Sequence, residues 1–133
     1  MSNLDARELR TRLERLGLAC PPPIPDSPPV SWRCLQSDAA RGQLAVTVLG
    51  ARPVEMVVAL LQQRQADDAA VAVRLAEVAD CVLAGGDAET SRAWIRANIA
   101  TGGGTVIGQT ELHLSGEPRS RVIDLKAVGS RYH

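Results

Sequence analysis

The chain has 133 residues, 15 basic and 15 acidic side chains, and apolar residues at 45% of its positions. This length favours a single domain that buries a core without disulfides or bound metal. Zero formal net charge and 2% aromatic residues argue against nucleic-acid binding, which needs a basic excess and, for single strands, rings that stack on bases.

The amino-terminal segment is densely charged, so we expect neither a secretion signal nor a membrane anchor. The longest apolar run, residues 56–61, is far too short to span a bilayer. Cys20, Cys34 and Cys81 are odd in number and widely spaced, which favours a reducing, cytoplasmic location. We expect Cys34 and Cys81 to be buried thiols and Cys20 to be exposed and able to cross-link on oxidation. Fourteen arginines against one lysine are typical of a GC-rich bacterial genome.

Residues 3–16 predict an amphipathic helix that ends at Gly17. Leu9, Leu13 and Leu16 form one narrow apolar stripe along it. A stripe of this width suits docking either against a protein partner or against the rest of the fold, and we take all three leucines as candidate partner contacts.

A proline-rich segment follows, with six prolines among residues 21–29. Fixed φ angles and few free N–H groups predict an extended, stiff spacer. Pro22 and Pro25 also have the spacing of a P-x-x-P ligand, which is the less favoured interpretation. We therefore divide the chain into an amphipathic helix at 1–20, the spacer, and one α+β domain at 30–133.

Two segments, 30–35 and 44–49, alternate between apolar and polar side chains and predict a β-hairpin. Beyond Pro53 the apolar residues of segment 53–65 cover most of a helical circumference, which predicts a helix buried by the fold or by a partner. A second helix is expected at 68–83, and whether the two form one long helix stays open.

Three apolar side chains of the helix expected at 53–65 complete the set of candidate partner contacts: Val57, Leu60 and Leu61.

The composition of the run Gly102–Gly104 suggests a phosphate-binding loop, but its position argues against one. A helix at 88–100, capped by Asp87, precedes the glycines and a strand follows them. The carbonyl end of the helix dipole would face that loop and repel an anion. We therefore predict that the glycines end the helix and lead into the strand.

The last third of the chain predicts a second hairpin, with strands at 105–114 and 119–128. A two-residue turn at 116–117 would place Leu125 opposite Gly108. The complete fold is thus α+β, an antiparallel sheet built from two β-hairpins with helices packed on one face, preceded by the N-terminal helix on its spacer.

Catalytic and metal chemistry find little support. His113, with Glu111 and Ser120 nearby, lies on the strand face expected to be exposed, so a surface histidine is favoured over a catalytic set. Histidine and cysteine spacing predicts no metal site, and we expect no cofactor and no catalytic residue.

Charge is unevenly distributed along the chain, although the total is zero. Residues 65–90 hold six acids against one arginine. The carboxyl-terminal segment is basic. In the least favoured of the functions that we consider, it binds nucleic acid through Arg119, Arg121, Lys126 and Arg131. Complementary charge of this kind can support self-association, although a solvated acidic face and a basic tail are favoured.

The sequence favours a non-enzymatic protein-interaction or adaptor module that forms a homodimer, with no membrane association and no nucleic-acid partner. The alternative is a small-molecule-binding protein or enzyme with a pocket between sheet and helices near Trp32 or Trp94. Pathway, ligand and partner identity are not encoded in any motif that we identify.

Overall fold

The structure is a computed structural model that describes residues 4–21, 31–38, 42–50 and 53–130. In chain order the elements are α1 (Ala6–Arg15), β1 (Ser31–Asp38), β2 (Gly42–Gly50), β3 (Val54–Gln62), α2 (Asp68–Val82), α3 (Gly86–Asn98), β4 (Gly103–Ile107), β5 (Thr110–Glu117) and β6 (Ser120–Ala127).

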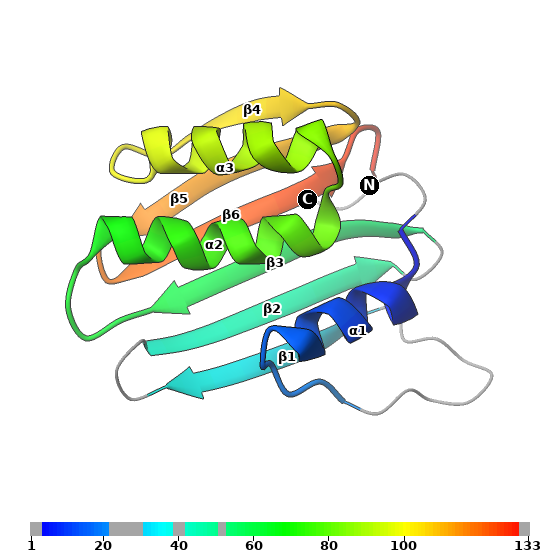
Figure 1. The fold of residues 1–133 in the computed structure, drawn as a ribbon, viewed down its shortest axis with the longest axis horizontal. Helices are drawn as coiled ribbons and strands as arrows, with labels where there is room; N and C mark the ends of the chain where they lie inside the picture. Colours follow the sequence, from blue (N-terminus) through cyan, green and yellow to red (C-terminus); the bar gives the residue numbers. More distant parts are fainter. Residues whose placement is uncertain (1–3, 22–30, 39–41, 51–52, 131–133) are drawn as a thin grey trace.

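The six strands form one sheet in the order β1-β2-β3-β6-β5-β4, with every neighbouring pair antiparallel. The helices lie on one side of this sheet (Figure 1). The predicted α+β class and its single helix layer are confirmed. The first predicted hairpin gains a third strand, β3. The single strand predicted at 105–114 is wrong, because a turn at 108–109 divides it into β4 and β5. The sheet thus consists of two three-stranded meanders joined where β3 pairs with β6.

The helix expected at 53–65 is wrong, because this segment forms β3 in the centre of the sheet. A central strand is apolar on both faces and can be mistaken for a buried helix. Val57 and Leu61 point into the core beneath the helices, whereas Val58 and Leu60 are partly exposed on the other face. The question of one long helix or two is thereby answered: α2 is the helical part.

One apolar core lies between the helices and the sheet. Leu13 from α1, Leu75 from α2 and Ile123 from β6 are each fully buried in it. Helix α1 is also fixed to α2 by a hydrogen bond that Arg12 Nη1 donates to the carbonyl of Cys81, at 2.8 Å. The stripe of α1 thus docks on the chain's own fold.

The glycine run behaves as predicted. The Gly102 N–H donates to the carbonyl of Asn98 in the last turn of α3, at 2.7 Å, and β4 begins at Gly103. Gly102 has a φ of +74°, and a Cβ there would lie 2.9 Å from the carbonyl oxygen of Leu114. The position therefore requires glycine for both its conformation and its space.

The start of α3 differs from the expectation. Its N-cap is Gly85, which has no side chain to accept a hydrogen bond, and Asp87 lies inside the first turn. The Asp87 carboxylate instead lies against the β4–β5 turn, where a Cβ on Gly108 would be 2.5 Å from its Oδ2. For α2, by contrast, Asp67 is the cap, as its position before the helix suggests.

The β5–β6 turn lies two residues later than predicted, and the register changes accordingly. Leu125 pairs with Leu112, not with Gly108, and Leu114 pairs with Ile123. The shift is even, so the same side chains still face the core. Alternation alone fixes the face of a strand and leaves such a shift undetermined.

Each half of the chain contains a helix followed by a three-stranded meander. The connection from α1 to β1 has 15 residues, 16–30, whereas the one from α3 to β4 has four, 99–102. The longer connection includes Ala19, which bridges to Leu35 of β1.

Candidate interaction surfaces

The sheet face opposite the helices, which we call the open face, is covered by no helix or strand of the described chain. One cross-strand row on it is apolar over four neighbouring strands and runs through Leu35, Ala45, Leu60 and Val122. Leu35 is 51% exposed and the other three are partly exposed. Neighbouring rows add Leu49, Met56 and Val58. The open face is therefore apolar over β1, β2 and β3.

Over β5 and β6 the open face carries two exposed charged pairs. Lys126 Nζ lies 3.2 Å from Glu111 Oε2, and His113 Nδ1 lies 3.9 Å from Asp124 Oδ2. Burial raises the pKa of the Asp124 carboxyl, and the coulombic effect of His113 partly opposes that rise.

The possible catalytic set around His113 is not assembled. Asp124 is opposite it in the register, whereas Ser120 pairs with Glu117 at the other end of the hairpin. The imidazole is 60% exposed on a strand face, where solvent screens its charge. This arrangement is typical of a surface ion pair.

The two edges of the sheet differ. Along β1, Ala19 forms an antiparallel bridge with Leu35 and so covers part of the outer edge. Along β4, no described residue forms a bridge to the outer edge, and Val106 is 58% exposed. A four-residue connection returns the chain from α3 to β4 too directly to add such a cover.

The six predicted partner contacts lie mostly inside the molecule. Leu9 and Leu13 are fully buried in the core, and Leu16 is partly buried against it. Val57 and Leu61 belong to the same core, whereas Leu60 lies in the apolar row of the open face. The error about 53–65 explains the positions of Val57, Leu60 and Leu61, because a strand sends alternate side chains to opposite faces.

The sequence analysis missed the open face and the β4 edge. The pairing of Leu35, Ala45, Leu60 and Val122 depends on strand order and register, which no local pattern of the sequence provides. A signal for β4 was present, since residues 103–107 contain no charged side chain and no proline, the usual protections of an edge strand.

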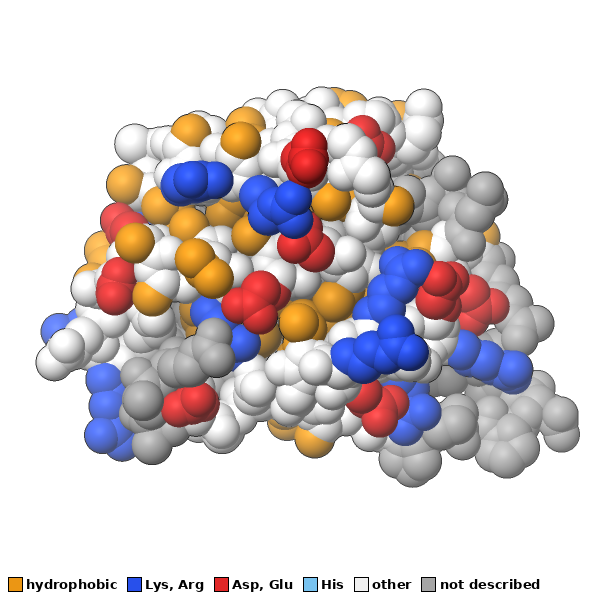
Figure 2. All heavy atoms as spheres, in the orientation of Figure 1, with side chains coloured by type: hydrophobic (Ala, Val, Ile, Leu, Met, Phe, Trp, Pro, Cys, Tyr) orange, Lys and Arg blue, Asp and Glu red, His pale blue; other side chains and the backbone are white. Residues whose placement is uncertain are grey.

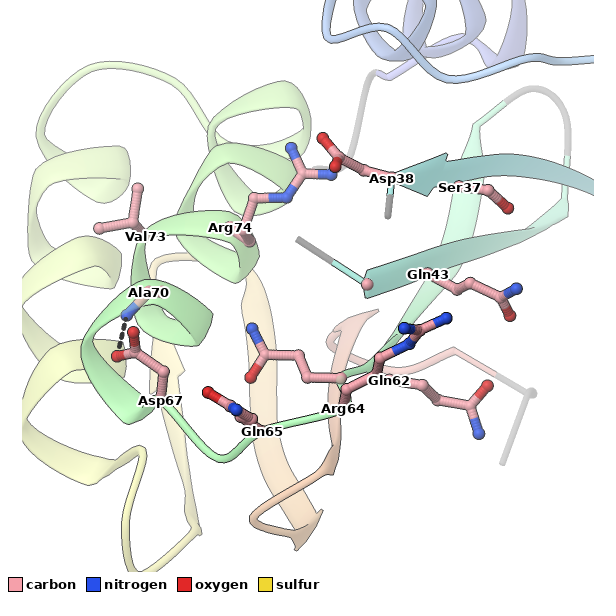
Figure 3. A pocket seen from close by; sticks show the side chains of 12 residues that line it. Ser37, Asp38, Gln43, Gln62, Arg64, Gln65, Asp67, Ala70, Val73 and Arg74 are labelled. Atoms are coloured by element: carbon pink, nitrogen blue, oxygen red, sulfur yellow. Dashed lines mark hydrogen bonds between the residues drawn. The ribbon is translucent and has the colours of Figure 1, made fainter. Parts of the chain in front are cut away.

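A cleft of about 1000 Å³ opens at one end of the sheet, where β1, β2 and β3 meet the start of α2 (Figure 3). Nine of its 12 lining residues have polar side chains, among them Gln43, Gln62, Arg64 and Asp67. Arg74 extends from α2 toward Asp38 of β1 across this cleft (Figure 3). It is lined by neither tryptophan: Trp32 is buried in the core, and Trp94 is partly buried against it.

Acidic and basic side chains lie next to one another over the helix-covered side (Figure 2). Asp80 is 3.0 Å from Arg92, and Asp68 is 3.6 Å from Arg121. Acids of segment 65–90 are thus neutralised within the chain, which weakens charge segregation as a source of self-association.

The basic residues near the carboxyl terminus do not form one patch. Arg121 is buried on the core side of β6, whereas Lys126 lies on the open face beside Glu111. Arg119 is exposed in the β5–β6 turn, and Arg131 lies outside the described residues. The three described basic residues, Arg119, Arg121 and Lys126, thus form no continuous surface for a nucleic acid.

The cysteines differ from the expectation in one respect. Cys20 and Cys34 form a disulfide, so Cys34 is not a free thiol. Cys81 is buried, as predicted, and burial is the main cause that raises its pKa to about 11. At neutral pH this thiol is protonated and unreactive.

Among the described residues, no group of three or more His, Cys, Asp or Glu side chains is placed to hold a metal ion. No helix in the same part of the chain is long and apolar enough to cross a membrane. Comparison with protein-family models, curated proteins and solved structures finds no match. Function is therefore argued from the geometry of these surfaces.

Proposed function

We propose that this chain is a non-enzymatic protein-interaction or adaptor module that associates with itself. One observation carries the proposal: the described sheet is covered by helices on one face only and bridged at one edge only. An apolar sheet face and an unprotected strand edge are surfaces that proteins use for association.

The position of the titratable side chains supports a non-enzymatic role. The pair His113–Asp124 and the pair Lys126–Glu111 lie on an exposed strand face. General acid–base catalysis needs groups that converge on a bound substrate with tuned pKa values. Side chains spread along a flat face bind protein surfaces more readily than they convert small molecules.

Self-association is testable by mixing two populations of the full chain labelled at the amino terminus with donor and acceptor dyes. We expect energy transfer that increases through micromolar concentrations and disappears when unlabelled chain is added in excess. Absence of transfer across this range would contradict the proposal. The unlabelled competitor separates specific association from dye-driven aggregation.

The alternative is a small-molecule-binding protein or enzyme, originally expected near Trp32 or Trp94. The observation in its favour is the polar cleft at the strand ends, whose glutamine and arginine side chains can bind a polar ligand. A metabolite screen followed by thermal shift tests it, with Gln62→Ala as the site variant and Gln109→Ala, on the distant β4–β5 turn, as its control. A ligand whose stabilisation is lost in the first variant alone would favour the alternative.

The cytoplasmic location stays part of the proposal, although the Cys20–Cys34 disulfide is atypical of a reducing compartment. The redox state of protein isolated from its cells under acid quenching decides between them. Two modifiable thiols at Cys20 and Cys34 would support the cytoplasm, and a protected pair would indicate an oxidising compartment.

A further inference from the structure

The outer edge of β4 has hydrogen-bonding groups that point away from the sheet. β4 and β5 are joined by a two-residue turn, with Ile107 paired to Thr110. In such a hairpin the pair next to the turn is hydrogen-bonded, and bonded pairs then alternate along the strands. Thr105 consequently bonds to β5, whereas Gly104 and Val106 direct their N–H and C=O groups outward.

This edge lacks the features that normally prevent strands from pairing with another chain. No residue of Gly103–Ile107 is charged or proline, whereas such residues protect many natural edge strands. The corresponding edge of β1 has Ala19 bridged to Leu35 and the disulfide of Cys34 beside that bridge. Only β4 combines a bare edge with an unprotected sequence in the described sheet.

Helix α3 lies along β4 in the opposite direction. Asp87, at the start of the helix, lies against Gly108 at the end of the strand, and Asn98 lies near Gly103 at the strand's start. Trp94 is seven residues beyond Asp87, about 10 Å along a helix. Thr105 is three residues before Gly108, about 10 Å along a strand.

Trp94 is therefore level with Thr105, the midpoint of β4. Asp87, Trp94 and Asn98 are spaced by seven and four residues, which places all three on the side of α3 that meets β4. Trp94 is partly buried there. Trp94 of α3 thus lies over the middle of β4, and it is the more exposed of the two tryptophans in the described residues.

We infer that β4 pairs antiparallel with β4 of a second copy, about a two-fold axis at Thr105 and Trp94, and joins the two sheets into one of twelve strands. This inference rests on the proposed self-association and identifies its surface. In that register Gly104 is opposite Val106 of the partner subunit. Each outward N–H and C=O of these two residues then meets a group of the other copy, giving four hydrogen bonds across the seam.

The side chains suit the same two-fold arrangement. Val106, 58% exposed on the open face, lies beside Gly104 of the partner subunit, which has no side chain to obstruct it. On the helix side, Trp94 meets Trp94 of the partner subunit across the axis. A self-complementary patch with a central tryptophan is typical of isologous dimers, and no like charges face each other along β4.

An extended peptide of another protein is the competing occupant of this edge. A second copy is favoured because the strand midpoint and the aromatic side chain lie at the same level, so that one axis satisfies both. A single extended peptide has no two-fold axis, so its binding would not require the strand midpoint and the aromatic side chain to lie at the same level.

The test compares Val106→Pro with Val106→Thr in the full chain. Proline removes the outward N–H and leaves the ladder with β5 intact, whereas threonine keeps both the N–H and the β-branched shape. We expect Val106→Pro to raise the dimer dissociation constant about tenfold or more and Val106→Thr to change it little. Circular dichroism and thermal unfolding confirm that each variant is folded.

A cross-link gives an independent measurement that does not depend on the proline variant folding. Thr105→Cys places two thiols opposite each other at the axis, with Cβ atoms about 5 Å apart across the seam. Mild oxidation should yield a disulfide-linked dimer. Gln109→Cys, on the exposed β4–β5 turn, should form no disulfide-linked dimer under the same conditions.

The outcomes separate this inference from the proposed function. A wild-type chain that is monomeric at all concentrations contradicts both. A wild-type dimer that is unaffected by Val106→Pro, or that leaves Thr105→Cys uncross-linked, contradicts the β4 seam and leaves self-association standing. Loss of the dimer in Val106→Pro together with cross-linking of Thr105→Cys supports both.

Discussion

Ala19 and Leu35 exchange two backbone hydrogen bonds, with N···O distances of 2.7 and 2.9 Å, at the outer edge of β1. Cys20 follows Ala19, and Cys34 precedes Leu35. The two cysteines are joined by a disulfide. Together these contacts cover part of one edge of the sheet with the chain's own backbone. The opposite edge, along β4, has no equivalent among the described residues.

The first prediction concerns the thiols. The native chain should not react with a thiol reagent at about pH 8, because Cys81 is buried with a pKa of about 11 and the other two cysteines are paired. After unfolding in denaturant without reductant, one thiol per chain should react. A count of three would contradict the disulfide, and rapid reaction in the native state would contradict the burial of Cys81.

The second prediction tests whether α1 is an integral part of the fold. Leu13 is fully buried, so Leu13→Ala should lower the free energy of unfolding by about 2–5 kcal/mol, measured by urea denaturation. Arg7→Ala, on the exposed side of the same helix, should change it by less than about 0.5 kcal/mol. Equal effects of the two substitutions would indicate a helix that does not pack on the body.

The third prediction compares two glycines at the ends of α3. Gly102→Ala should destabilise the chain by about 1–3 kcal/mol, because φ is positive and the new Cβ would lie 2.9 Å from the Leu114 carbonyl oxygen. Gly86→Ala should stabilise it by about 0.5 kcal/mol, since it lies in the helix with no atom within 4 Å of the added Cβ. Thermal unfolding measures both, and a neutral Gly102→Ala would contradict the requirement for glycine at this position.

The fourth prediction concerns pH. Burial raises the pKa of Asp124 above its ordinary value, against the smaller effect of His113, so the folded chain binds this proton more tightly than the unfolded chain. Ionisation of Asp124 therefore reduces stability as pH rises through its folded-state pKa. Asp124→Asn removes that cost and should raise the free energy of unfolding at about pH 8, where an ordinary carboxyl is ionised.

The gain from Asp124→Asn should shrink as pH falls and disappear at about pH 3, well below the ordinary aspartate pKa, where the carboxyl is protonated in both states. Urea denaturation of the variant and the unchanged chain across this range gives the comparison. A loss of stability at about pH 8 would show that the contact with His113 outweighs the burial of the charge.

Local signals in the sequence predicted several elements correctly. The alternation in residues 30–35 and 44–49 corresponds to β1 and β2, and the glycines after Ile99 end α3 as their chemistry requires. These features depend on a few neighbouring residues, where turn and cap preferences act directly.

Two errors have a common physical origin. The sequence predicts a helix at 53–65 because β3 is apolar on both faces. Apolar residues on every side of a segment fit a buried helix equally well. The predicted register pairs Leu125 with Gly108, four residues from its actual partner Leu112. Alternation determines which face Leu125 occupies, but not which residue it pairs with on the neighbouring strand. Both depend on which strands become neighbours, which is a tertiary property.

The candidate surfaces were beyond the sequence for the same reason. Leu35 and Val122 are 87 positions apart by their numbering, yet they belong to one row through Ala45 and Leu60. Leu9 and Leu13, which the sequence suggests as partner contacts, are instead buried in the core. An amphipathic stripe indicates that one side of a helix is buried, but it does not indicate which surface buries it.

Self-association of the unmodified full chain can be measured by sedimentation equilibrium over a range of micromolar concentrations. We expect a molar mass that rises with concentration toward twice the 14.1 kDa of one chain and does not exceed it, because a two-fold seam at β4 closes on itself. A mass that stays at that of one chain throughout would contradict self-association.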